Sequence, residues 1–432
     1  MQRIVKFLKY WDYSAYRVSV VTVKSSHSFA EDPTLLDEIP VRVQVIRSGS
    51  LDPFRLASLF KRILPFKRRN PSELVYESAG FWRRLAMRVF IPDSRLLWLP
   101  FALWKLWRLH RHQPIDVLFA SMPPFTTGLI AALWKRWAPG RLILDFRDAW
   151  TENPYLPEIG SWHRNITEWL ERLTIQQADG YVFVNPLLAE YYRQRYPLIE
   201  GRAWQVIRNG YDPDDLPKSP RSSPVPDRSS QFRLGILGTI YSQGNRPLSL
   251  LQAIRHMLDN SPELAGTFRL VFIGKWSPDF LNRFRSYRLE GVSEFIPYLP
   301  HRQALQEAAR LDALALAIEG NLVGSERVTP GRIYEHLALR KPILAMCPLD
   351  GDLAELIRQC QAGEVVPHDD VEGIKRVLAQ WLTYPERSRE KYRFERIEQF
   401  ERSVQTRQLM EFVRTILTEE DPSSHEDTHS PG

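Results

Sequence analysis

Cysteine is scarce in this chain of 432 residues, which contains only Cys347 and Cys360. Two cysteines without a pattern of pairs exclude a disulfide framework and a cysteine zinc site, and they favour a reducing compartment. Long apolar runs are also missing, because no segment approaches the roughly 18 apolar residues of a membrane span. The first residues lack a secretory apolar region with a cleavage site. We therefore expect a cytoplasmic protein.

Metal and nucleic-acid signals are weak. The ten histidines form no HExxH motif and no cluster with cysteine, which excludes the zinc hydrolases. Asp-x-Asp occurs at Asp212–Asp214 and Asp350–Asp352, but turn formation and helix capping explain both. We expect no required metal or other cofactor. Basic and aromatic residues interleave without forming a known nucleic-acid module, so we expect no nucleic-acid partner.

Positive charge is in excess. The net charge is +7, and the segment after Leu417 is acidic, so the rest of the chain is more basic than the total. This excess favours anionic partners such as phosphorylated ligands or a membrane surface. With 44% hydrophobic residues the chain can bury a large core, and its length predicts two domains.

Short runs rich in Val, Ile, Leu and aromatic residues alternate with helical patterns along both halves of the chain. The predicted strands are Val18–Val23, Val41–Ile46, Val117–Ala120, Leu142–Leu144, Gly180–Val184, Trp204–Ile207, Phe232–Leu237, Phe268–Ile273, Glu294–Ile296, Ala313–Ala317 and Pro342–Ala345. Such alternation predicts an α/β protein with two Rossmann-like βαβ domains that face a central cleft at the carboxyl ends of their strands.

The predicted boundaries follow from composition. Five prolines between Asp212 and Asp227 (at 213, 217, 220, 224 and 226) indicate a linker. We place the domains at 1–211 and 232–380, the linker at 212–231, C-terminal helices at 381–417 and a disordered tail at 418–432.

The segment Thr329–Ile343 carries the clearest chemical pattern. It combines a Pro-Gly entry, a short helix with Glu335 about one turn inside, and a buried strand after Pro342. Backbone N–H groups and the helix dipole attract phosphate, and a carboxylate can accept both hydroxyls of a ribose. The pattern suits a ribose-phosphate ligand. An ordinary amphipathic helix with a solvated glutamate remains open.

Residues 82–112 combine cations with tryptophan. They hold seven Lys or Arg residues against one acid, Asp93, interleaved with four tryptophans: Trp82, Trp98, Trp104 and Trp107. Interfacial tryptophans with cations toward anionic headgroups would dock this segment on the inner leaflet of a membrane. A core position for the tryptophans, with the cations facing water, remains equally open.

Several motifs together resemble glycosyltransferase family 4, whose members have the two-domain GT-B architecture. The resemblance covers nearly the whole chain and is strongest to bacterial members that build surface polysaccharides. Its main anchors are Asp145–Thr151, Asn209–Asp212, Gly238–Tyr241 and the helix around Glu335; supporting matches are Pro92–Arg95, Ser121–Pro124 and Ala178-Asp179. It implies that the C-terminal helices cross back to the first domain.

The resemblance also implies the donor site. In the family the second domain binds a nucleotide-sugar, and the helix glutamate, here Glu335, binds the ribose. A second family glutamate, eight positions earlier, contacts the sugar. In this chain Arg327 stands at that position. Either a one-residue bulge brings Glu326 into this catalytic place, or the sugar is held differently. The other implied donor-binding residues are Gly238, Thr239, Arg246, Lys275 and Arg332. A solvated surface place for each cation and an ordinary turn for Gly238 stay open.

The acceptor side is expected after the strand Leu142–Leu144. Asp145, Arg147 and Asp148 lie where this strand should end at the cleft. An acid there, Asp145 in the first place, could orient or deprotonate an acceptor hydroxyl. Asp148 as a turn cap and Arg147 in a structural ion pair remain open alternatives. No covalent nucleophile emerges, which fits a retaining transfer on one face of the sugar.

We therefore expect a retaining glycosyltransferase that moves a sugar from a nucleoside-diphosphate sugar to a polysaccharide or lipid-linked acceptor in cell-surface glycan synthesis, peripherally on the inner face of the plasma membrane. A nucleotide-sugar epimerase or hydrolase of the same fold, and a catalytically silent scaffold, remain alternatives.

The segment Met1–Lys9 resembles the first helix of the family's cleft and not its first strand. Relatives precede this helix with a strand and a Gly-rich loop, so we expect translation to begin upstream of Met1.

Overall fold

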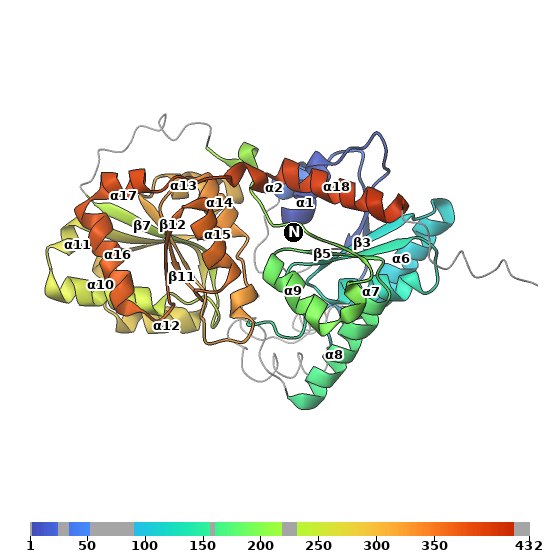
Figure 1. Cartoon of the computed structure of the whole chain (residues 1–432), viewed down its shortest axis with the longest axis horizontal. Coiled ribbons are helices and arrows are strands. Elements are labelled where there is room, and N and C mark those ends of the chain that lie inside the picture. The colour runs from blue at the N-terminus through green and yellow to red at the C-terminus, as the bar shows by residue number, and fades with distance from the viewer. Residues whose placement is uncertain (1, 25–33, 52–89, 156–159, 218–230, 419–432) are drawn as a thin grey trace, which may run out of the picture.

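The computed structural model describes residues 2–24, 34–51, 90–155, 160–217 and 231–418. They form two α/β domains with parallel sheets, which confirms the expected pair of Rossmann-like domains (Figure 1). No described helix is both long and apolar enough to cross a bilayer. Three predictions fall partly outside the described residues: the Trp/Arg segment at 82–89, the linker at 218–230 and the tail at 419–432.

The N-terminal domain is built on strands that are apolar over most of their length. Strand β4 (Arg141–Phe146) contains Leu142, Ile143 and Leu144, all fully buried, as is typical of a parallel sheet covered on both faces. The sheet order is β3-β4-β5-β6, with β3 at Val117–Met122, β5 at Gly180–Phe183 and β6 at Ala203–Val206. The helices are η1 (Leu96–Trp98), α6 (Leu99–His112), α7 (Thr126–Lys135), α8 (Ser161–Gln176), α9 (Pro186–Arg195) and η2 (Pro197–Ile199).

A second strand pair accompanies this sheet. Strand β1 (Ser19–Val23) runs parallel to β2 (Gln44–Ser48), and within the described residues it pairs with no other strand. In the same part of the chain β3 pairs only with β4. Both β1 and β3 line one cavity, so they border a common space. The helices α1 (Gln2–Tyr10) and α2 (Thr34–Asp37) complete this side of the domain.

The C-terminal domain contains a six-stranded parallel sheet of order β12-β11-β10-β7-β8-β9. Its strands are β7 (Phe232–Ile240), β8 (Phe268–Trp276), β9 (Ser293–Pro297), β10 (Ala313–Ala317), β11 (Ile343–Met346) and β12 (Gly363–Val366). Strand order reverses beside β7, and such a switch point opens a crevice at the carboxyl ends of the strands.

Helices surround this sheet. They are α10 (Leu248–Asn260), α11 (Leu264–Thr267), α12 (Pro278–Ser286), η4 (Glu290–Val292), α13 (His301–Ala309), η5 (Ser325–Arg327), α14 (Arg332–Ala338), α15 (Asp352–Cys360) and α16 (Val371–Thr383). Most of their apolar sides join the strands in a core in which Phe272, Tyr334 and Trp381 are fully buried. Ala308 of α13 packs in a second cluster with strand residues that include Val271.

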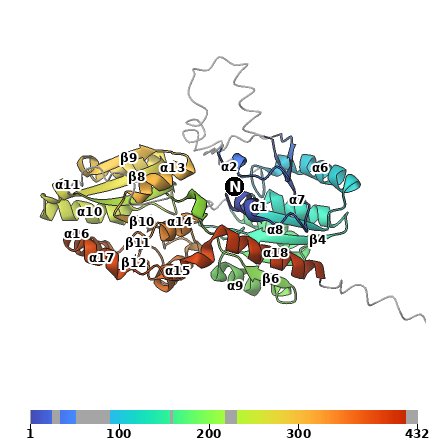
Figure 2. The same ribbon diagram turned by 90° about the horizontal axis from the view of Figure 1, so that it is seen from above.

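The C-terminal helices return to the N-terminal domain, as predicted. After α17 (Pro385–Lys391) and η6 (Ile397–Phe400), α18 (Arg402–Thr418) lies along α1, and Leu409 and Phe412 join a core cluster with Phe7 (Figures 1 and 2). The crossing is held where Tyr211 N–H donates to Phe400 O (3.0 Å) and Arg402 N–H donates to Tyr211 O (2.9 Å).

The start of the predicted linker is buried. Residues Pro213–Asp215 form the short helix η3, and Asp212 caps it by accepting from Asp214 N–H (3.0 Å). Asp212 and Asp215 are each only 4% exposed. The Asp-x-Asp at 212–214 therefore caps a turn, as predicted, and also takes part in the ion pairs described below.

Candidate active site

A cavity of about 1930 Å³ lies between the domains and extends into the space bordered by β1 and β3. From the C-terminal domain it is lined by Gly238, Gly274, Arg332 and Glu335; from the N-terminal domain it is lined by Ser121, Arg147, Asp148 and Tyr155. These residues lie at or just beyond the carboxyl ends of β3, β4, β7 and β8, or on α14. The cleft therefore lies at the carboxyl ends of the strands, as predicted.

Two glycines form its floor in the C-terminal domain. Gly238 at the end of β7 pairs in register with Gly274 of β8, and both have positive φ angles, of 93° and 144°. A Cβ atom on Gly274 would lie 2.2 Å from Gly238 O, and one on Gly238 would lie 2.6 Å from Arg332 Nη1. Positive φ angles and these close approaches favour glycine at both positions, and both residues line the cavity. Gly274 was not predicted, although it follows a buried strand just as Gly238 does.

Helix α14 presents two of the predicted donor residues to the cavity. The Arg332 guanidinium donates to Leu237 O, while its Nε is buried and has no hydrogen-bond partner within the described residues. Burial lowers the pKa of Arg332. The Glu335 side chain is 17% exposed, and burial raises the pKa of its carboxyl above the ordinary value. A guanidinium and a largely desolvated carboxylate thus share one wall.

Three other predicted donor residues lie away from the lining. The Arg246 side chain forms two hydrogen bonds to Glu319, at 2.7 and 2.9 Å, so this cation is already neutralised. The Thr239 carbonyl accepts from an asparagine side chain (2.8 Å). Lys275 lies over the ring of Tyr298, 4.8 Å from its centre, and Tyr298 lines the cavity. Lys275 is therefore marginal to the site, and Arg246 has a structural role.

Glu326 does not face the cavity. It belongs to η5, its side chain is 41% exposed, and its carboxylate pairs with Arg327 Nε at 3.1 Å. No bulge brings it to the donor wall, which corrects the expectation of a catalytic place for this residue.

The surroundings of the two acids differ, since Asp145 lies within β4 and Asp148 follows it. Asp145 is fully buried and accepts from Arg3 (2.9 and 3.1 Å) and from Ser121 Oγ (2.7 Å). This ion pair corrects the expectation that Asp145 meets the acceptor. Asp148 lines the cavity, and burial raises the pKa of its carboxyl to about 6 against the opposing effect of Arg147. Arg147 itself donates to the backbone carbonyls of Met122 and Pro123.

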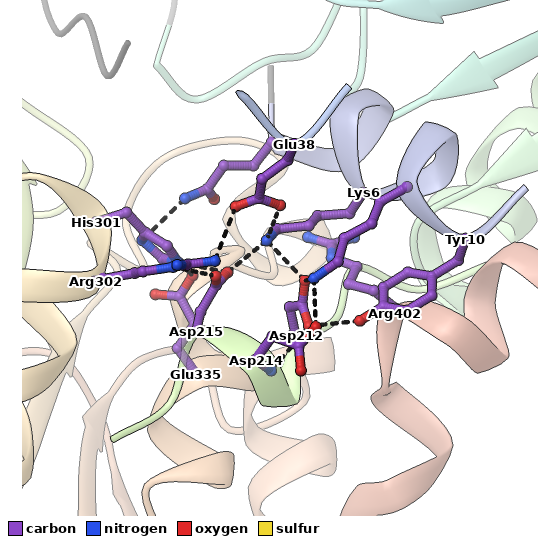
Figure 3. Close-up of polar contacts among 12 residues, drawn as sticks. Lys6, Tyr10, Glu38, Asp212, Asp214, Asp215, His301, Arg302, Glu335 and Arg402 are labelled. Atoms are coloured by element: carbon purple, nitrogen blue, oxygen red, sulfur yellow. Dashed lines mark hydrogen bonds and ion pairs between the residues drawn. The ribbon is translucent and has the colours of Figure 1, made fainter. Parts of the chain in front are cut away.

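An ion-pair network connects the domains beside this cavity (Figure 3). Lys6 Nζ lies 2.5 Å from Glu38, 2.7 Å from Asp212 and 2.7 Å from Asp215. These three carboxylates are the one group in the described part of the chain whose spacing could hold a metal ion, and the ammonium contacts all of them. The network continues through His301 to Glu335. Sequence patterns gave no signal for it, because its members come from five separate segments.

Comparison with known proteins gives a match to a family model and several solved structures with the same fold. Residues 7–210 match the family model described as a glycosyl transferase 4-like domain, and no curated protein matches the sequence. Sucrose-phosphate synthase from Thermosynechococcus elongatus is 12% identical with a TM-score of 0.62, over 95% of this chain and 92% of that chain.

Two further structures with the same fold were solved with ligands. The Anabaena protein HepE, in complex with UDP-glucose, is 15% identical with a TM-score of 0.53, over 73% of this chain and 82% of that chain. A trehalose-phosphate synthase from Burkholderia xenovorans, in complex with glucose-6-phosphate, is 12% identical with a TM-score of 0.54, over 78% and 82%. At these identities the likeness is one of fold.

Proposed function

The chain is a glycosyltransferase of the family 4 type with a GT-B fold, and from this premise we propose that it transfers a sugar from a nucleoside-diphosphate donor with retention of configuration. The observation that carries the proposal is the donor wall, where Arg332 and Glu335 line the cavity above Gly238 and Gly274. HepE, which shares the fold, was solved with UDP-glucose, and this supports a donor of the same class.

Each group on the donor wall has a role in this proposal. The leaving diphosphate gains negative charge as the glycosidic bond breaks, and the Arg332 guanidinium lines the cavity beside Gly238. The glycines let the diphosphate approach the backbone. The Glu335 carboxylate accepts hydrogen bonds from the ribose hydroxyls. A desolvated carboxylate makes strong bonds of this kind.

Asp148 is the acid proposed for the acceptor side. It faces the cavity from the N-terminal domain, and a carboxylate with a pKa of about 6 is ionised at neutral pH and basic enough to take a proton from an acceptor hydroxyl. Arg147 positions this loop, since it donates to two carbonyls at the end of β3.

The proposed acceptor is a polysaccharide or lipid-linked glycan at a membrane surface. Helix α6 presents Trp104 and Trp107, 50% and 49% exposed. Lys105 lies 4.8 Å from the ring centre of Trp104, and Arg111 lies 4.9 Å from that of Trp107. Tryptophan beside cations is a combination suited to anionic headgroups. Trp98 does not take part, because it is buried and donates to Ser48 Oγ (2.6 Å).

Thermal shift with UDP, GDP, ADP, CDP and dTDP tests the donor site. At least one nucleoside diphosphate should raise the melting temperature, and Glu335→Ala should weaken its binding at least tenfold, as expected when a charged hydrogen-bond partner of about 1.5–3 kcal/mol is lost. Glu355→Ala, which changes an exposed glutamate on α15, is the matched control. A wild-type protein that responds to none of the five would overturn the proposal.

Product analysis separates the possible activities. With radiolabelled nucleotide-sugars and a bacterial membrane extract as acceptor, transfer gives a labelled glycan or lipid. Epimerisation gives a new nucleotide-sugar, hydrolysis gives free sugar, and a scaffold turns over nothing. Only the first result supports the proposed transfer.

A further inference from the structure

We propose that His301 is a positioning residue for the donor: it orients the Glu335 carboxylate toward the ribose and links it to the N-terminal domain through Asp215 and Lys6. The proposal rests on the donor site proposed above. It is carried by the network beside the cavity, which Figure 3 shows.

The geometry places His301 between two carboxylates. Its Nε2 lies 3.5 Å from Glu335 Oε1 and 3.5 Å from Asp215 Oδ2. On the other side of the ring, Nδ1 lies 3.0 Å from the side-chain amide of Gln2, which offers both a donor and an acceptor. The Nε2 atom faces both carboxylates, and the protonated ring directs an N–H and a positive charge toward them.

One side chain contacts the Glu335 carboxylate directly. Within the described residues, His301 is the sole side chain that forms an ion pair with it, at 3.5 Å when the ring is protonated. A long side chain that must present two oxygens to a ribose gains from a fixed neighbour, because an unfixed rotamer must be ordered on binding at a cost of about 0.5–1.5 kcal/mol. His301 begins α13 and is itself largely buried, so it is a rigid support.

The contact continues into the N-terminal domain. Asp215, which His301 faces, also binds Lys6 of α1 at 2.7 Å. Lys6 in turn binds Asp212 and Glu38. The chain of contacts thus joins α14 and α13 of the donor domain to α1 and α2 of the acceptor domain. A ligand that fixes Glu335 must bias this network, and by reciprocity the network biases ligand affinity.

Charged groups on every side set the protonation of His301. Burial, the largest effect, and Lys6 of α1 lower its pKa, while Asp215 of η3 and Glu335 of α14 raise it, and the net direction is upward from 6.5. Two more charged groups adjoin the cluster. Arg302, on the same helix as His301, lies 3.1 Å from Asp215 and 3.7 Å from Glu38 of α2. Beyond Glu335 stand Arg332 and Arg402, which, like His301, favour its ionised form.

The ionisation of Glu335 determines the direction in which nucleotide affinity should change with pH. The donor ribose needs Glu335 ionised, and burial raises the pKa of that carboxyl while His301 lowers it. Removing the histidine leaves the burial effect less opposed, so protonation of Glu335 begins at a higher pH. Nucleotide affinity should therefore be lost at a higher pH in the variant than in the wild type as the pH falls.

Isothermal titration with the nucleoside diphosphate that stabilises the wild type most, from pH 5.5 to 8.5, tests the proposal on the full chain. His301→Gln should weaken binding roughly tenfold at pH 7, within the usual range of coupled sites, and should shift the low-pH loss of affinity upward. His256→Gln, an exposed histidine on α10, is the control and should match the wild type.

A double-mutant cycle with Asp215→Asn separates positioning from general destabilisation. If Asp215 acts through His301, the double variant should bind no more weakly than His301→Gln alone. Circular dichroism confirms that each variant is folded. A wild-type affinity and pH profile in His301→Gln would overturn the inference and leave the donor site standing. Additive effects in the cycle would overturn the link to Asp215. A wild type that binds no nucleoside diphosphate would overturn the proposed function itself.

Discussion

At the residue scale, surroundings decide which acid near β4 can react. Asp145 is enclosed by Arg3 and Ser121, and its two oxygens are already engaged. Asp148 stands three residues later, lines the cavity, and within the described residues has no hydrogen bond or ion pair through its carboxylate. A partly desolvated, unengaged carboxylate at a cleft is the group available to accept a proton.

Asp148→Asn should therefore lower the transfer rate about 100-fold or more while nucleotide binding is kept. In the wild type the rate should fall below about pH 6, where burial causes the carboxyl to be protonated. Transfer assays from pH 5 to 8 measure both effects, with the exposed Asp369→Asn as the control. An unchanged rate and profile in Asp148→Asn would remove this residue from the mechanism.

The same substitution should stabilise the fold at neutral pH. The folded-state pKa of Asp148 is raised from 3.8 to about 6, so the folded state binds more protons between these values and the wild type loses stability as pH rises through that window. Asn does not titrate. Urea unfolding should show Asp148→Asn more stable by about 1–3 kcal/mol at pH 8 and by almost nothing near pH 4.

At the scale of elements, the strands that are buried on both faces were predictable, because their apolar runs have no other stable place than a covered parallel sheet. Strand β12 was missed: it has four residues, Gly363–Val366, with Glu364 among them, and lies at the sheet edge. Local patterns carry no comparable signal for such a short, partly polar strand.

Among the site residues, too, some positions were predictable from the sequence and others were not. The positions of Gly238, Arg332 and Glu335 on the cavity wall were predictable, because strand ends and an adjacent helix meet at one edge of a parallel sheet. Arg246 was misplaced because Glu319, which neutralises it, lies 73 residues away, and Asp145 because its partner is Arg3, 142 residues away. Ion pairs between distant segments follow from tertiary packing, which periodicity and spacing do not encode.

Helix α6 provides the prediction that belongs to this scale. Its sequence contains no acid, and Trp104 and Trp107 project beside Lys105 and Arg111. The protein should sediment with vesicles containing anionic lipid, less strongly as salt increases, because surface charges are screened within about 10 Å at 0.1 M salt. Trp104→Ala with Trp107→Ala should weaken binding several-fold. Trp169→Ala, an exposed tryptophan of α8, is the matched control.

Equal binding to neutral and anionic vesicles would contradict electrostatic docking through α6. A loss of binding in Trp169→Ala as large as in the α6 double variant would show that α6 has no special part.

At the scale of the whole molecule, side-chain contacts hold the two domains together across the cleft. Arg208, which follows β6, forms two hydrogen bonds to Asp352 of α15, at 2.7 and 2.8 Å. Arg327 of η5 pairs with Glu152 at 3.0 Å and lies over the ring of Tyr191, 3.9 Å from its centre. Since transferases of this architecture work on ligands bound between domains, these contacts bear on how far the cleft opens.

Arg327→Ala should shift the nucleotide-free protein toward open arrangements. The substitution removes the interdomain ion pair to Glu152 and the cation–π contact, together worth about 1–2 kcal/mol for a partly buried side chain. This is enough to change a domain equilibrium by a factor of about 5–30. Small-angle X-ray scattering should show a larger radius of gyration for Arg327→Ala than for the wild type. Arg283→Ala, which removes an exposed arginine paired within α12, should leave the radius unchanged. The Arg327 and Arg283 variants could both have the radius of the wild type. In that case the two chain connections between the domains, at Tyr211 and Arg402, and the remaining contacts fix the domains without Arg327.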